Sequence, residues 1–223
     1  MNNKPKDIGS KINVYLEIIV RDKHGLVRQY IRKKSAVRNL GRILYGLLLA
    51  RGGYPLGEEG VKASCNVREP EYGSSVEVWT EWYSNIIYGG GTPMGCNADS
   101  GDDSYGIVVG SGSTPVSDDD YNLESKIPHG TGDGQLYYSE HSFSDVEVGG
   151  NYARFRVARN FSNLGSVDVT VYEFGLIVRN YWKHKNAITK DVMFLICRDV
   201  VSEGVVVKPN ETLTVAYIFE VTL

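Results

Sequence analysis

"LTVAYIFEV", residues 213–221, is the stretch that decides the fold. All of its odd positions are apolar, whereas Thr214 and Glu220 stand at even positions. Such alternation with a period of two is typical of a β-strand that buries one face. Ile218 makes the polar side of the pattern less regular. We therefore predict a strand over 212–222 with its odd positions facing a core.

Similar runs fill most of the chain before this strand. Residues 12–20 and 26–32 flank a turn that begins at Asp22, and together they predict a hairpin. Further strand-like runs follow at 76–83, 105–109, 135–143, 152–161, 166–178, 192–197 and 204–207. Many short strands separated by glycine-rich turns favour two packed antiparallel sheets. The predicted fold class is all-β, an antiparallel jelly-roll β-sandwich.

One segment near the N-terminus has a different period. Apolar residues recur at steps of three and four between Val37 and Leu48. This spacing predicts one N-terminal amphipathic helix over about 36–51. Ser35 is a candidate N-cap, and Gly52 and the glycine after it are a candidate end.

The domain organisation follows from these runs. Residues 1–11 are polar and basic, and they predict an N-terminal arm. Residues 12–223 are expected to form a single jelly-roll domain, which includes an irregular region rich in Gly and Tyr at 53–104. No apolar run reaches the roughly 18 residues that span a bilayer, and no signal-peptide hydrophobic region follows the start.

Charge is distributed unevenly along the chain. Residues 1–51 hold 12 Lys or Arg and 3 acids, a net of +9, whereas the other 12 bases face 24 acids, a net of −12. This asymmetry favours oriented contact with a polyanion, either genomic DNA or an anionic membrane, although solvated strand faces would also explain it. The residues we expect at such a contact are Lys4, Lys6, Lys11, Arg38 and Arg42.

The glycine-rich segment 106–125 resembles a phosphate-binding loop at first sight. Gly112 is followed by Ser113 rather than by the Lys-Ser or Lys-Thr pair of a P-loop. Three consecutive carboxylates at 118–120 would repel a phosphate group. A calcium loop beginning at Asp118 is the remaining alternative, but it lacks the glycine and the glutamate that an EF-hand needs. We expect a surface connection between two strands, without cofactor or metal.

A sugar site is the second functional alternative. Glu77 and Glu81 flank aromatic residues, but four residues along a strand span roughly 13 Å, too far for a glycosidase carboxyl pair. Trp79 and Trp82 could still stack on a carbohydrate, as in a lectin-like or tail-fibre module. We therefore expect no enzymatic activity and no catalytic residues.

The cysteines, the histidines and the glycosylation sequons give little evidence of function. Cys65 and Cys96 could form a disulfide bond, and the four histidines lack the spacing of metal ligands. His129, Asp133, Glu140 and His141 could gather around a metal in three dimensions, but the sequence gives no reason to expect it. Asn160 and Asn210 begin N-glycosylation sequons, of which the second lies in an expected turn.

An ordered set of short segments carries a family resemblance. The segments are RDKHG (21–25), SAVRNL (35–40), VVGSGSTP (108–115), DYNL (120–123), RNFSN (159–163), EFGL (173–176), CRDV (197–200) and VKPNETLTV (207–215). Together they resemble capsid-vertex (penton-base) proteins of double-stranded DNA viruses, in particular those of the Sulfolobus turreted icosahedral virus type. The resemblance covers most of the chain outside 53–104.

The resemblance implies a structural role in a virion. A penton base of this type would form a homopentamer at the five-fold vertex, contact the major capsid protein and support turret or spike proteins. The basic N-terminal end would then face the interior, toward an internal membrane or the genomic DNA. The family implies no catalytic residues.

Overall fold

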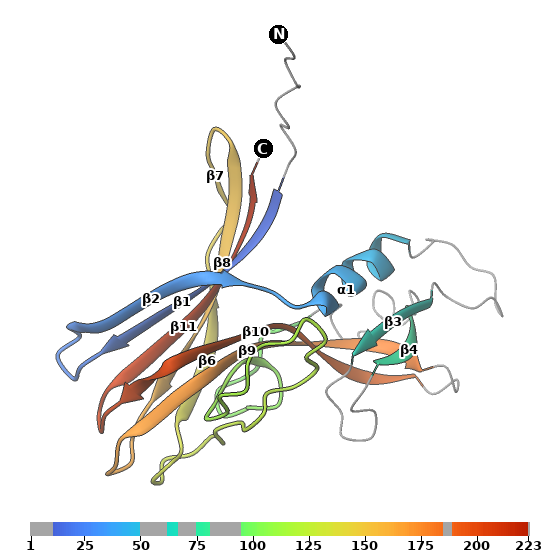
Figure 1. The fold of residues 1–223 in the computed structure, drawn as a ribbon. Helices are drawn as coiled ribbons and strands as arrows, with labels where there is room; N and C mark the ends of the chain where they lie inside the picture. The colour runs from blue at the N-terminus through green and yellow to red at the C-terminus, as the bar shows by residue number, and fades with distance from the viewer. Residues whose placement is uncertain (1–10, 50–61, 67–74, 81–94, 185–188, 223) are drawn as a thin grey trace.

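The structure is a computed structural model that describes residues 11–49, 62–66, 75–80, 95–184 and 189–222 (Figure 1). The first sheet, called sheet A here, has the order β2 (Val27–Ser35), β1 (Lys11–Arg21), β11 (Thr212–Thr222), β8 (Tyr152–Ser162) and β6 (Tyr137–Phe143), and the short β7 (Glu147–Val148) also pairs with β8. All of these pairs are antiparallel.

The second sheet, sheet B, packs against sheet A. Its order is β10 (Thr189–Val207), β9 (Val169–His184), β4 (Ser75–Thr80) and β3 (Lys62–Asn66), and β5 (Gly106–Gly110) also pairs with β9. These pairs are antiparallel as well. With one helix, α1 (Arg38–Leu49), the described chain is an all-β sandwich, as predicted.

The strand 212–222 has the predicted bounds, and it lies inside sheet A between β1 and β8. Leu213, Val215 and Tyr217 are completely buried, whereas Phe219 is partly buried and Val221 is exposed. The predicted inward face is therefore correct for its first three positions. Burial of the odd positions decreases toward the C-terminal end of this strand, because the hydrophobic core does not extend that far.

The neighbouring strands build the rest of the core by the same rule. In β1 the even positions Leu16, Ile18 and Val20 are buried, and in sheet B the side chains of Phe174 and Leu176 are buried as well. Cross-strand apolar contacts of this kind, on two facing sheets, are the main source of sandwich stability.

Two sequence predictions need correction in detail. The runs 192–197 and 204–207 belong to one strand, β10, which is interrupted by irregular pairing around Gly204. Gly204 has a φ of 70°, a value that glycine adopts without strain. The second correction is that the helix begins at Arg38, later than predicted.

Ser35 is not the N-cap of this helix. It is the last residue of β2, and its hydroxyl donates a 2.5 Å hydrogen bond to Asp199 Oδ2 in β10. The start of the helix is held instead by bonds from the Val37 backbone N–H to Ile196 O (3.1 Å) and from Asn39 Nδ2 to Leu195 O (3.2 Å). α1 is therefore fastened to the edge of sheet B. The predicted stop at Gly52 lies outside the described residues.

Candidate functional site

The glycine-rich loop after β5 is organised by a single buried carboxylate. Glu173 in β9 is completely buried, and it accepts backbone hydrogen bonds from Gly112 (3.2 Å), Glu124 (2.9 Å) and Ser125 (2.7 Å). A Cβ atom at Gly110 would lie 2.5 Å from Glu173 Oε1 and from Ser125 O. The glycines are thus explained by the close approach of this carboxylate, and a phosphate is not needed to account for them.

Arg198 in β10 completes this arrangement. It donates from Nε and Nη2 to Glu173 Oε2 at 3.1 and 3.0 Å, and from Nη1 to Asp120 Oδ2 at 2.9 Å. A fourth bond reaches Thr114 O at 3.2 Å. The guanidinium therefore connects the loop to sheet B and balances the buried charge of Glu173.

The other two carboxylates of the acidic run face the helix. Arg38 lies 3.5 Å from Asp118 and 3.2 Å from Asp119, and Arg42 lies 3.0 Å from Asp119. The two arginines that we predicted at a polyanion contact are thus engaged by the protein's own acidic loop. Lys11, the first residue of β1, is exposed, and Lys4 and Lys6 lie outside the described residues.

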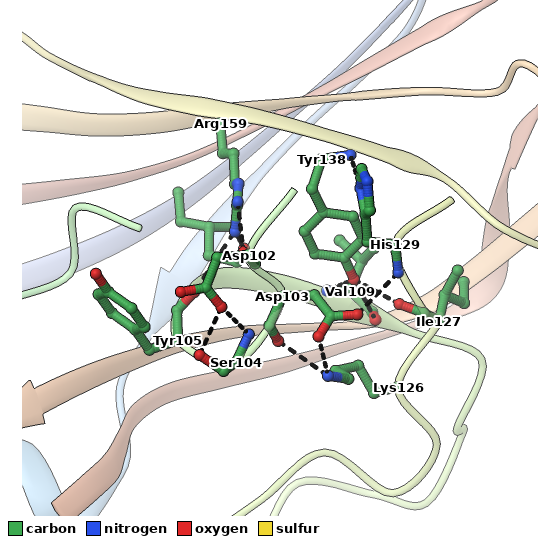
Figure 2. Close-up of polar contacts among 11 residues, drawn as sticks. Asp102, Asp103, Ser104, Tyr105, Val109, Lys126, Ile127, His129, Tyr138 and Arg159 are labelled. Atoms are coloured by element: carbon green, nitrogen blue, oxygen red, sulfur yellow. Dashed lines mark hydrogen bonds and ion pairs between the residues drawn. The ribbon is translucent and has the colours of Figure 1, made fainter. Parts of the chain in front are cut away.

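Arg159 organises a second polar cluster, between β8 and the segment before β5 (Figure 2). Its side chain is buried, and its donors reach five carbonyl oxygens, those of Asp99, Asp102, Tyr105, Ile107 and Ser139. The guanidinium also lies 4.9 Å from the centre of the Tyr138 ring. This arginine fixes the course of residues 99–107, which carry the chain into β5.

The neighbouring polar side chains also bind backbone groups of this region (Figure 2). Lys126 Nζ donates to Asp103 Oδ1 at 2.6 Å, and the other oxygen of Asp103 accepts from the His129 backbone N–H at 2.8 Å. Nδ1 of His129 accepts from the Tyr138 N–H (3.1 Å), and the Tyr138 hydroxyl donates to Ile127 O (2.6 Å). Except for the Lys126–Asp103 ion pair, each of these contacts joins a side chain to a backbone group of another segment.

His141 is a buried member of the same cluster. Its Nε2 accepts a 2.8 Å hydrogen bond from the Ile107 N–H, and its Nδ1 lies 3.1 Å from Ala98 O. Burial, with a contribution from the positive charge of Arg159, lowers the pKa of His141 to about 4. The ring is therefore neutral at pH 7. Within the described ranges, no group of three or more His, Cys, Asp or Glu side chains is arranged to hold a metal ion.

The remaining sequence candidates lie apart from these clusters. Cys96 and Cys197 are free thiols, so Cys96 does not form the disulfide bond that was considered with Cys65. Asn160 is an exposed residue of β8, and Asn210 is exposed in the β10–β11 turn, as predicted. The side chain of Trp79 and the whole of Trp82, on which the sugar-site alternative depends, lie outside the described residues.

An apolar groove lies between the two sheets, next to α1 and the segment that leads into β7. Its volume is about 560 Å³. Sheet A contributes Ile12, Phe143, Phe155, Phe219 and Val221, and the β6–β7 connection contributes Val146. Sheet B contributes Leu176, Val178 and Ile196, and α1 contributes Leu40 and Leu44. Among the lining residues that the structure describes, only Arg154 and Glu220 carry charges.

Several large apolar side chains at this groove are exposed to solvent. Ile12 is 64% exposed and Val146 is 63% exposed, and nearby Val148 in β7 is 76% exposed. The rings of Phe155 and Phe219 stack with their centres 5.1 Å apart. Contiguous exposed apolar surface of this kind marks sites that contact other macromolecules. The groove is thus the candidate functional site.

Sequence reasoning did not predict this groove. The apolar positions of β11 were assigned to a continuous core, because a period of two reveals which face is apolar and not whether another sheet covers it. The one signal was the isolated apolar pair Val146 and Val148 among polar and glycine residues.

No family model matches the chain, and it matches neither a curated protein nor a solved structure. In the part of the chain that the structure describes, no helix combines the length and the apolar character needed to cross a membrane.

Proposed function

We propose that the chain is a virion structural protein, the penton base at a capsid vertex, and that the apolar groove is its contact with neighbouring subunits. The observation that carries this proposal is the exposure of large apolar side chains, such as Val146 and Phe143, at the open end of the sandwich. Leaving such a surface in water is unfavourable by about 25 cal/mol for each Å². Burial between subunits removes this cost.

The use of the polar residues supports the same role. Arg159, Arg198, Glu173 and Asp103 all hold backbone segments in place through hydrogen bonds. Fixed loops on a rigid sandwich give a subunit reproducible contact surfaces, which a closed symmetric shell requires.

The assembly we propose is a homopentamer that contacts the major capsid protein and supports turret or spike proteins. Its jelly-roll connectivity remains part of the proposal, which the pairing of β1 with β11 at the centre of sheet A supports. The basic N-terminal end faces the interior of the particle in this proposal. The lectin-like alternative remains a prediction that depends on Trp79 and Trp82.

Native mass spectrometry tests the proposal. We expect a pentamer for the unaltered chain and a folded monomer for Val146→Asp, which places a charge in the groove at a position that is already exposed. Leu164→Asp is the matched control, because Leu164 is 51% exposed and does not line the groove. A monomeric unaltered chain at high concentration, or a pentamer that Val146→Asp leaves intact, would overturn the proposal.

A further inference from the structure

The outer face of sheet A has a composition that the proposed assembly does not explain. Because paired residues in antiparallel strands point to the same side, the outward positions follow from the register. Tyr15 pairs with Lys34, Glu17 with Arg32 and Ile19 with Tyr30, whereas Leu16 and Ile18, between them, are buried in the core. β1 and β2 thus present cations and tyrosines on one side of the sandwich.

Several cations of this region lack a carboxylate partner among the described residues. Arg28 pairs with Glu211, and Lys33 pairs with Asp199. The exposed side chains of Lys11, Arg21, Lys23, Arg32 and Lys34 form no ion pair with any described residue. We call these five residues the β1–β2 cations.

The one acid at the centre of this face is already neutralised. Glu17 Oε1 lies 3.1 Å from Nη2 of Arg156 in β8, and Glu17 Oε2 accepts a 3.3 Å hydrogen bond from the Tyr30 hydroxyl. The face therefore keeps a net positive charge.

Two aromatic rings lie among these cations. The Arg32 guanidinium lies 4.7 Å from the centre of the Tyr15 ring, which holds it flat against the sheet. Tyr30 is 55% exposed, so one side of its ring is available for stacking. Cations that follow a phosphate backbone, combined with aromatic rings that stack on bases, are the features by which proteins bind single-stranded nucleic acid.

We propose that the outer face of β1 and β2 binds nucleic acid, with phosphates on Arg32, Lys34 and the other β1–β2 cations and a base stacked on Tyr30. The charge on this face matches a polyphosphate chain. An anionic membrane is less well matched, because a membrane-binding face needs large apolar side chains beside its cations. Those side chains lie mostly at the groove, although Leu26 and Val27 are exposed at the hairpin tip. The binding does not require the pentamer, so its test is independent of the assembly test.

The experiment measures fluorescence anisotropy of labelled oligonucleotides of about 20 nucleotides, single- and double-stranded, at about 50 mM and about 200 mM salt. We expect the unaltered chain to bind, and Lys34→Glu to weaken binding about tenfold and to reduce the salt dependence. The matched control is Lys208→Glu, a reversal at an exposed lysine of the β10–β11 turn, which should change binding less than about twofold.

Substitutions of Tyr30 separate stacking from charge. Tyr30→Ala should weaken single-strand binding about tenfold, and Tyr30→Phe should preserve it because the ring remains. Equal losses for Lys34→Glu and Lys208→Glu would overturn the proposal, since binding would then follow total charge alone. It is also overturned if the chain binds vesicles rich in phosphatidylserine and neither oligonucleotide.

Discussion

Arg198 and Glu173 form a buried ion pair between neighbouring strands, with two hydrogen bonds of 3.0 and 3.1 Å to a single carboxylate oxygen. Their side chains are 3% and 0% exposed. The pair holds the β5–β6 loop over the outer surface of sheet B, because Glu173 also accepts three backbone N–H groups of that loop.

Removing the arginine should therefore be strongly destabilising. In Arg198→Ala, the charge of Glu173 stays buried without its partner, and we expect a loss of about 3 to 5 kcal/mol in the free energy of unfolding. Urea denaturation followed by circular dichroism measures it. The control is Arg154→Ala, which breaks an exposed pair with Glu147 and should change the free energy of unfolding far less, because solvent screens this pair. Equal effects would contradict the buried pair as a stabilising element.

Gly110 should not tolerate a side chain. A Cβ at this position would lie 2.5 Å from Ser125 O, a backbone atom, and from Glu173 Oε1, so we expect Gly110→Ala to destabilise by about 1 to 3 kcal/mol. Gly150 is the matched control, because a Cβ there would meet no atom within 4 Å. Thermal unfolding of the two variants compares them, and a Gly110→Ala protein as stable as Gly150→Ala would show that the loop can move away.

Arg159→Met should loosen the segment that leads into β5. The substitution keeps a long side chain but removes the donors to five carbonyl groups, and buried polar groups left without partners cost about 1 to 3 kcal/mol each. We expect hydrogen exchange to accelerate over residues 99–107 before it changes in β1. Unchanged protection of 99–107 would show that Arg159 does not fix this segment.

Stability should depend little on pH between 7 and 4 as far as Asp199 and His141 are concerned, because the two groups act in opposite directions. Burial raises the pKa of Asp199 from 3.8 to about 6, despite the opposing effects of Ser35 and Lys33, so the folded state takes up this proton first and stability rises as pH falls below about 6. The pKa of His141, lowered from 6.5 to about 4, makes the unfolded state take up the proton first, so stability falls over nearly the same range.

Asp199→Asn removes the first of these two effects. The whole Asp199 shift corresponds to about 3 kcal/mol, and most of it takes effect by pH 4. The variant should therefore lose about 2 kcal/mol more than the unaltered chain on going from pH 7 to pH 4. Urea titrations at the two pH values measure the difference, with exposed Asp168→Asn as the control. The same pH dependence in the unaltered chain and in Asp199→Asn would disprove the assignment.

The sequence predicted which segments form strands and the helix better than it predicted which of these segments contact one another. Alternation identified β11, and strand composition beside a turn identified β1; each of these strands buries one face over several positions. β10 was divided in two because Gly204 resembles a turn, although the strand pairing with β9 resumes after an irregularity. Ser35 was predicted as the N-cap because it stands just before the helical pattern. Its actual hydrogen-bond partner, Asp199, is too distant in sequence to be recognised.

The same limit applies to the candidate site. The pair Arg198–Glu173 depends on which strands become neighbours, and the pair Arg38–Asp119 depends on where α1 meets the β5–β6 loop. The sequence contains no local signal for either contact. The residues that flank Gly110 and Gly112 differ from those of phosphate-binding loops, but the reason for these glycines, a buried glutamate more than 60 positions away, was visible only in the fold.

The position of β11 also determines the order in which the chain can fold. Ile18 pairs with Val215, 197 residues later, and β11 joins β1 to β8. Contacts of such long sequence separation form slowly, because the entropy of closing the loop is lost before the pairing compensates for it. During synthesis, the β1–β2 hairpin must therefore wait for the last strand with its apolar face uncovered. Repulsion between the cations of β2 would keep the hairpins of two incompletely folded chains from pairing with each other. The positive charge of β2 therefore also protects the nascent chain from aggregation.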